Sequence, residues 1–177
     1  MEEVLITYPS KNATSREAAF SLARGFEEAG SNVNLESPSS ILAEKLKDYD
    51  LIVVMGSTRG CLHCEVCKNC PLKEMRIFLY RMSHGIKLTG LRAVVIGLHP
   101  SSHHAMKATK IFTKALQKVK MQVIYQETLP ANLSHPLDPQ TRDRLRAIAI
   151  KLFSYREIPE SVRGAKSTST NFPVRRL

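Results

Sequence analysis

The apolar residues of this chain fall into two kinds of segment that alternate along the sequence. Short continuous apolar runs are typical of parallel strands that are buried on both faces. Longer segments with apolar residues at positions i, i+3, i+4 and i+7 are typical of amphipathic helices. The strand-like runs lie at residues 4–8, 32–35, 51–55, 92–97 and 121–125.

Helical spacing fills the intervals between these runs. In the first interval the apolar face predicts a helix from about Ser15 to Gly30, because a glycine is well suited to end a helix. Pro71 and the pair Asp138-Pro139 are suited to the first turns of two later helices. The remaining helices are predicted around residues 38–46, 71–82, 108–119 and 138–152.

The regular alternation of strands and helices predicts an α/β fold. Crossover connections between parallel strands are right-handed, so successive units place helices on both faces of the sheet. We therefore expect a three-layer sandwich around a five-stranded parallel sheet of order 2-1-3-4-5. The periodicity stops near residue 156, which predicts one domain over residues 1–155 and a basic, Ser/Thr-containing tail over residues 156–177.

Charge and composition narrow the range of partners. The chain has 26 Lys and Arg residues against 16 Asp and Glu residues, a net charge of +10. Such a surface favours an acidic redox protein, nucleic acid or an anionic membrane face. Nucleic acid is the weaker of these, because no basic run is interleaved with aromatic residues and the chain has no Trp. The sequence shows no membrane span and no signal-peptide pattern, so we expect a cytoplasmic protein.

A run of four cysteines is the strongest chemical signal in the chain. Cys61, Cys64, Cys67 and Cys70 are its only cysteines, each gap is two residues, and the run follows a predicted strand. Thiolates this dense suit an iron–sulfur cluster or zinc, and the spacing is close to that of a ferredoxin run. Two disulfides are the alternative, although they would close strained small loops. We expect the four thiolates to hold one centre, a 4Fe–4S cluster or zinc.

The loop after the first strand is a candidate anion site. Ligands of such sheets bind beyond the carboxyl ends of the strands. The unpaired N–H groups and the dipole at a helix N-terminus favour a phosphate there. Thr14 and Glu17 also fit a capping box, which explains these two residues without a ligand. The candidate residues are Ser10, Lys11, Asn12, Ala13, Thr14 and Ser15.

Three segments of the chain resemble the flavodoxins and the FMN domains of diflavin reductases. Residues 8–14 are similar to the hydroxyl-rich first loop of that family, which follows a Tyr-Gly. Residues 49–60 look like its Asp-apolar-Gly-x-Thr-aromatic-Gly segment, and residues 97–104 look like its Gly-Leu-Gly-Asp-Ser-x-Tyr segment. The similarity covers about residues 3–155. It implies a flavodoxin-like fold, FMN as cofactor, and transfer of one or two electrons.

The resemblance also implies where FMN binds. The phosphate would lie on residues 10–15, and the isoalloxazine ring would lie between two later loops. The histidines of the loop after the fourth strand are expected to be solvated loop residues or residues of a helix N-terminus, because no carboxylate partner is evident for them in the sequence. The two loops are Ser57, Thr58, Arg59 and Gly60, and His99, Pro100, Ser101 and His103.

Several positions depart from the family pattern. Arg59 and His103 stand where the family has the two aromatic residues that sandwich the ring. Both side chains can stack on a π-face, and the arginine would favour an anionic reduced flavin. Family glycines and one aspartate are replaced by Pro9, Ala13, His99 and Pro100.

Two functions follow from these observations. The first is an FMN-binding electron carrier or small flavin-dependent oxidoreductase, with a cysteine-ligated centre beside the flavin. The second is a module of the same fold that has lost flavin and uses a structural zinc or iron–sulfur site for partner binding. Hydrolase and nucleoside-triphosphatase functions have no support, because the chain has no Ser/His/Asp order, metalloprotease helix or Walker loop.

Overall fold

The computed structural model of the protein describes residues 1–56, 71–85, 87–99, 102–131 and 135–154. The four cysteines lie outside these ranges, as do residues 57–60, Pro100, Ser101 and the predicted tail. Within the described ranges, strands and helices alternate along the chain as the sequence predicts.

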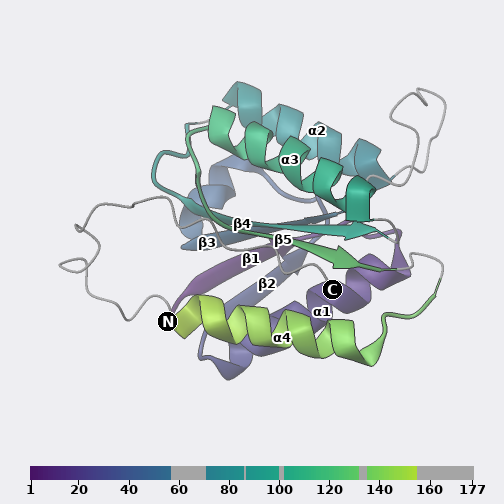
Figure 1. Ribbon diagram of the computed structural model, residues 1–177. Helices are drawn as coiled ribbons and strands as arrows, with labels where there is room; N and C mark the ends of the chain where they lie inside the picture. Colours follow the sequence, from purple (N-terminus) through teal and green to yellow (C-terminus); the bar gives the residue numbers. More distant parts are fainter. Residues whose placement is uncertain (57–70, 86, 100–101, 132–134, 155–177) are drawn as a thin grey trace, which may run out of the picture.

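A five-stranded parallel sheet forms the centre of the molecule (Figure 1). Its strand order, β2-β1-β3-β4-β5, confirms the predicted order. All four neighbouring pairs are parallel, as right-handed crossovers through helices require. The strands are β1 (Glu3–Thr7), β2 (Asn32–Glu36), β3 (Leu51–Gly56), β4 (Arg92–His99) and β5 (Gln122–Pro130).

Helices cover both faces of this sheet, which completes the predicted three layers (Figure 1). Helices α1 (Ala13–Glu28) and α4 (Pro139–Ser154) pack side by side on one face. Helices α2 (Pro71–Gly85) and α3 (Ser102–Lys118) pack on the other face, together with the short 3-10 helix η1 (Ala43–Asp48).

The alternation of side chains along each central strand builds two separate cores. In β3, Val53 and Met55 belong to the core under α1 and α4, whereas Ile52 and Val54 belong to the core under α2 and α3. Because successive residues of a strand point to opposite faces, a strand covered on both faces must be apolar throughout. The continuous apolar runs of the sequence therefore identify the central strands.

The predicted ends of several elements differ from the observed ones. The edge strand β5 continues to Pro130, five residues beyond the predicted end. Its residues alternate between exposed and partly buried, because one edge and part of each face meet solvent, so polar residues do not interrupt it. Helix α1 ends at Glu28, and Gly30 follows it with a φ of +91°, a conformation that favours glycine.

Candidate functional site

The carboxyl ends of β1, β3 and β4 meet at one edge of the sheet, where the arrowheads point in Figure 1. Gly56 pairs with Gly97 in the register of β3 and β4, and Thr7 pairs with Val54 in that of β1 and β3. The chain order reverses between β1 and β3, because β1 connects outward to β2 whereas β3 connects onward to β4. Ligands of open α/β sheets bind in the crevice at such a reversal. We call this side of the molecule the carboxyl edge.

Helix α1 opens at this edge, six residues after the end of β1. Asn12 is its N-cap, with extended backbone and a side-chain oxygen 2.8 Å from the Ser15 nitrogen that donates to it. This bond satisfies one of the four N–H groups that a helix N-terminus leaves without an intrahelical acceptor. Ser10 and Lys11 precede the cap and are exposed. The residues predicted to bind an anion therefore surround the positive end of a sixteen-residue helix.

The capping box predicted from Thr14 and Glu17 is wrong. The Thr14 hydroxyl donates to the carbonyl oxygen of His135 at 2.9 Å, and the Leu137 nitrogen donates to the Glu17 carboxylate at 2.8 Å. Arg142 adds an ion pair to the same carboxylate at 3.3 Å. Both side chains thus bind the connection between β5 and α4, which lies more than a hundred residues away in sequence. A local motif cannot reveal partners at that separation.

Helix α2 also reaches the anion loop. The Lys11 ammonium lies 4.0 Å from the Glu74 carboxylate, in the first turn of α2. The cysteine run is bounded by Gly56, at the end of β3, and by Pro71, at the start of α2. Both ends of the cysteine segment are therefore attached at the carboxyl edge, beside the start of α1. The cysteines themselves lie outside the described residues.

His99 is not a solvated loop residue, contrary to the prediction. It is the last residue of β4 and is only 8% exposed. Its carbonyl oxygen accepts a hydrogen bond from the Ala131 nitrogen at 3.2 Å, which continues the pairing of β4 with β5. The predicted loop is short, because α3 starts at Ser102 and already contains His103. The other ring-binding residues predicted from the resemblance, 57–60 and 100–101, lie outside the described ranges.

Gly56 ends β3 against helix α3. A Cβ atom at this position would lie 3.0 Å from two ring atoms of Phe112. Contacts that short require the neighbour to shift, so the close approach of the aromatic ring explains the glycine. This packing holds Gly56 directly under α3. Gly56 is the residue immediately before the predicted ring loop.

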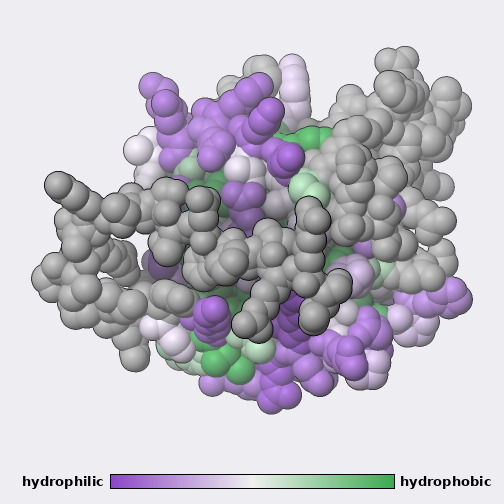
Figure 2. All heavy atoms as spheres, in the orientation of Figure 1, coloured by the Kyte–Doolittle hydropathy of each residue, from purple (hydrophilic) through white to green (hydrophobic). Residues whose placement is uncertain are grey.

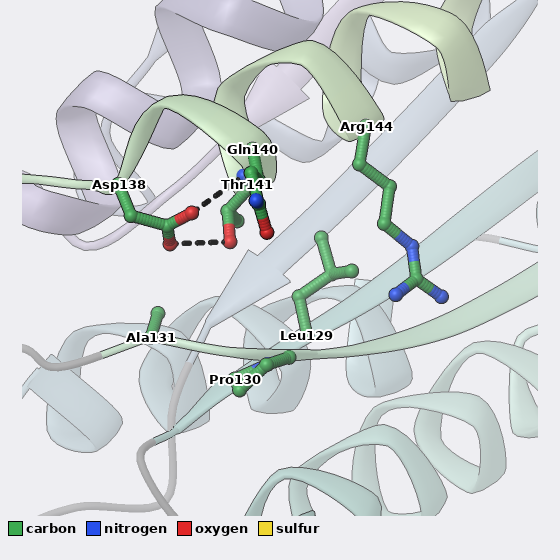
Figure 3. A pocket seen from close by; sticks show the side chains of 7 residues that line it. All are labelled: Leu129, Pro130, Ala131, Asp138, Gln140, Thr141 and Arg144. Carbon is green, nitrogen blue, oxygen red and sulfur yellow. Dashed lines mark hydrogen bonds between the residues drawn. The ribbon is translucent and has the colours of Figure 1, made fainter. Parts of the chain in front are cut away.

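A hollow of about 440 Å³ lies beyond the end of β5 (Figure 3). The sequence pattern does not predict it, and the Asp138-Pro139 helix start is the only signal near it. Asp138 accepts hydrogen bonds from the Thr141 nitrogen at 2.9 Å and from the Thr141 hydroxyl at 2.5 Å, which lowers the pKa of its carboxyl group. Arg144 is paired with Glu127 at 2.9 Å. The lining residues are Leu129, Pro130, Ala131, Asp138, Gln140, Thr141 and Arg144.

The charged side chains that line the hollow, Asp138 and Arg144, therefore already have hydrogen-bond or ion-pair partners within the protein. Its carboxylate caps α4, and its guanidinium is bound to β5. A ligand there would have to displace these contacts, which makes it a weaker candidate than the start of α1. Within the described ranges, no group of three or more His, Cys, Asp or Glu residues is arranged to hold a metal ion. None of the described helices is long and apolar enough to cross a bilayer.

Known proteins match this chain in structure and not in sequence. No protein-family model matches the sequence, and no curated protein sequence matches it significantly. Oxidised flavodoxin 2 from Bacillus cereus superposes with a TM-score of 0.68 at 20% identity, over 87% of this chain and 99% of that protein. The flavodoxin of Streptococcus pneumoniae TIGR4 gives 0.66 at 16% identity, over 86% and 97%. Two-electron reduced flavodoxin from Megasphaera elsdenii gives 0.59 at 16% identity, over 84% and 98%.

These similarities establish a flavodoxin-like fold, as the sequence predicted. At such low identity they establish the fold alone, because one fold serves many functions. The function must be argued from the residues at the carboxyl edge.

Proposed function

We propose that this protein binds FMN and transfers electrons, as a carrier or as a small flavin-dependent reductase. The observation on which this rests is the N-terminus of α1, which opens at the chain reversal between β1 and β3 with Ser10 and Lys11 exposed beside it. Flavodoxins of the same fold have been solved in oxidised and two-electron reduced states, which supports electron transfer as the class of function.

The start of α1 fits the phosphate of FMN. The helix dipole and the N–H groups of the first turn favour an anion. Lys11 adds a positive charge, with its side chain 54% exposed on the same loop. Ser10 adds an exposed hydroxyl, and the cap leaves the amide nitrogen of Asn12 as a further donor. We therefore assign phosphate binding to residues 10–15, within which the Thr14 hydroxyl is already bound to the His135 carbonyl oxygen.

We assign the ring to the two loops that the resemblance implies, Ser57, Thr58, Arg59 and Gly60, and His99, Pro100, Ser101 and His103. When bound, the isoalloxazine supplies one- and two-electron chemistry. The ends of β3 and β4, from which the two loops start, support this assignment. Gly56 is packed under Phe112, and the His99 carbonyl is tied to Ala131, so both loops start from rigid positions.

We further propose that Cys61, Cys64, Cys67 and Cys70 hold one centre, a 4Fe–4S cluster or zinc. The support comes from their spacing and from the anchoring of their segment at the carboxyl edge, where Glu74 lies near Lys11. A cluster would supply single-electron chemistry beside the flavin, whereas zinc would only cross-link the loop. The reducing cytoplasm, which we propose as the location, keeps such thiols available for metal.

The net charge of +10 supports an acidic redox protein as the partner, with nucleic acid as the weaker alternative. The division of the chain into residues 1–155 and a tail from residue 156 remains a prediction.

One observation favours the second function, a partner-binding module without flavin. The Thr14 hydroxyl is bound to the His135 carbonyl and the Asn12 amide oxygen caps α1, so two of the predicted phosphate ligands already have partners within the protein. In such a module the cysteines would hold a structural zinc or iron–sulfur site.

Purification without air followed by absorption spectroscopy and metal analysis separates the two functions. Flavin bands, with or without a broad thiolate-to-iron band, are expected for the electron-transfer protein. Titration of FMN into any protein isolated without it completes the test. A colourless protein that contains stoichiometric zinc and binds no added FMN would contradict electron transfer and favour the partner-binding module.

A further inference from the structure

Basic residues are concentrated on one side of the molecule. Helix α3 contains four lysines and no acidic residue, and α2 contains three basic residues and the single acidic residue Glu74. On the opposite face, α1 contains two arginines and three glutamates, and α4 contains four basic residues and one aspartate. Among the four long helices, α2 and α3 together therefore have the larger excess of basic over acidic residues. Figure 2 shows hydrophilic side chains over α3.

Three of the four lysines of α3 form a row that makes no ion pair within the described part of the chain. Lys110, Lys114 and Lys118 are exposed and follow one another at i, i+4 spacing, so neighbours on the helix surface repel. None of the ion pairs among the described residues involves them. Helices α1 and α4, by contrast, are joined by the ion pair of Arg146 with Glu28 at 2.6 Å. An acidic partner would relieve the repulsion in α3.

Apolar side chains lie exposed on the same pair of helices. Tyr80 is 65% exposed on α2, Ile77 is 41% exposed one turn before it, and Met106 is 47% exposed on α3. Tyrosine and methionine are enriched in protein–protein interfaces. Phosphates gain nothing from contact with Ile77 or Met106, so these residues favour a protein over nucleic acid as the partner.

We propose that the outer surface of α2 and α3 is the docking surface for an acidic protein. Met106 continues the lysine row of α3, and Ile77 and Tyr80 are exposed near Arg81 on α2. These two helices therefore present both the apolar and the charged side chains that protein interfaces use. Complementary charge would speed association and orient the partner. The residues of this α2–α3 surface are Ile77, Tyr80, Arg81, Met106, Lys110, Lys114 and Lys118.

The α2–α3 surface begins at the carboxyl edge. Helix α2 starts directly after the cysteine run, and α3 starts at Ser102, three residues after the end of β4. A protein docked on these helices would thus lie next to the proposed cofactors. Only the redox character of the partner rests on the proposed function, because the surface itself requires no flavin.

The test compares two variants of equal charge change. Lys110→Glu with Lys114→Glu alters the α2–α3 surface, and Arg24→Glu with Lys151→Glu makes the same change on α1 and α4. Binding of three probes is measured by titration calorimetry at low ionic strength: a strongly acidic [2Fe–2S] ferredoxin, a short DNA duplex and phosphatidylglycerol vesicles. We expect the ferredoxin to bind, the first variant to lose about tenfold in affinity and the second to change less than about twofold.

Two further variants separate docking from folding. Lys114→Glu alone places a glutamate between two lysines at i, i+4, so it should raise the melting temperature while it weakens ferredoxin binding. Tyr80→Ser should weaken ferredoxin binding without altering its dependence on salt. Equal losses in the two double variants, tighter binding of the duplex or of the vesicles, or no ferredoxin binding would each overturn the inference. Ferredoxin binding by a protein that takes up no FMN would overturn the redox function and leave the docking surface intact.

Discussion

Asp138 illustrates how one residue decides where an element starts. Its carboxylate accepts hydrogen bonds from the nitrogen and the hydroxyl of Thr141, and its backbone carbonyl accepts from the Arg142 nitrogen. The sequence pair Asp138-Pro139 predicts this start, because aspartate is a good N-cap and proline suits the first turn. The hydrogen bonds from Thr141 lower the pKa of the carboxyl group in the folded state.

Asp138→Ala should therefore destabilise the protein by about 1 kcal/mol at neutral pH, the usual cost of a lost N-cap. Because the pKa is lowered on folding, the charged form contributes stability above the unfolded value of 3.8, and this contribution is lost as the pH falls through the lower folded value. Urea unfolding at neutral and acidic pH measures the effect. Asp138→Asn, which keeps the cap and cannot titrate, is the control. A difference between wild type and Asp138→Ala that grows on acidification would contradict the argument.

At the scale of the element, the start of helix α1 has two roles. It borders the candidate anion site, and it holds the β5–α4 connection in place. Asn12 caps it, Ser10 and Lys11 border its positive end, and the side chains of Thr14 and Glu17 hold the β5–α4 connection. Of the residues predicted to bind an anion, Ser10 and Lys11 thus face solvent, whereas Thr14 binds a distant segment of the fold.

Ser10→Ala and Thr14→Ala should separate these two roles. Ser10→Ala should weaken FMN binding several-fold with little change in stability, because an exposed hydroxyl is lost. Thr14→Ala should cost about 1 kcal/mol of stability, because it removes the hydrogen bond to His135. Fluorescence titration with FMN and urea unfolding measure the two effects. If Ser10→Ala leaves FMN affinity unchanged, residue 10 is no phosphate ligand.

The contact of β3 with α3 gives a second prediction at this scale. Gly56→Ala should destabilise the protein by about 1–3 kcal/mol, because the added methyl group would lie too close to the Phe112 ring. Phe112→Leu in the same chain opens space and should make the alanine less costly, so the double-mutant cycle should show favourable coupling. Additive effects would show that the two residues do not compete for space.

At the scale of the whole molecule, the sheet brings three distant segments to one edge. The start of α1, the end of β3 and the end of β4 all meet there, and the cysteine run follows β3 in the sequence. The contact between Lys11 and Glu74 connects the first of these with the helix that follows the cysteines. Because these segments meet at one edge, we propose that they form a single redox site.

Replacement of any one of Cys61, Cys64, Cys67 and Cys70 by Ser should then remove most of the metal, because one centre needs all its ligands. Metal analysis of the four single variants, purified without air, measures this. Tyr80→Ser, which leaves the cysteine run intact, is the control. Normal metal content in two of the four cysteine variants would show that they do not share one centre.

The sequence by itself determined the architecture. Continuous apolar runs identified the central strands β1, β3 and β4, since a strand covered on both faces has no polar side, and alternation with helices led to the strand order. The start of α4 at Asp138 and the glycine that follows α1 were also predictable, because these signals act within a few residues.

Tertiary structure decided the partners and the burial of individual side chains. Thr14 and Glu17 have the spacing of a local cap, but the fold carries residues 135–137 past the start of α1, and these bonds replaced the capping box. His99 has the sequence context of a loop residue, but pairing with the extended β5 buried it. Periodicity reports which face of an element is apolar. Which distant segment meets that element depends on how the chain closes around the sheet, and a local pattern contains no information about that.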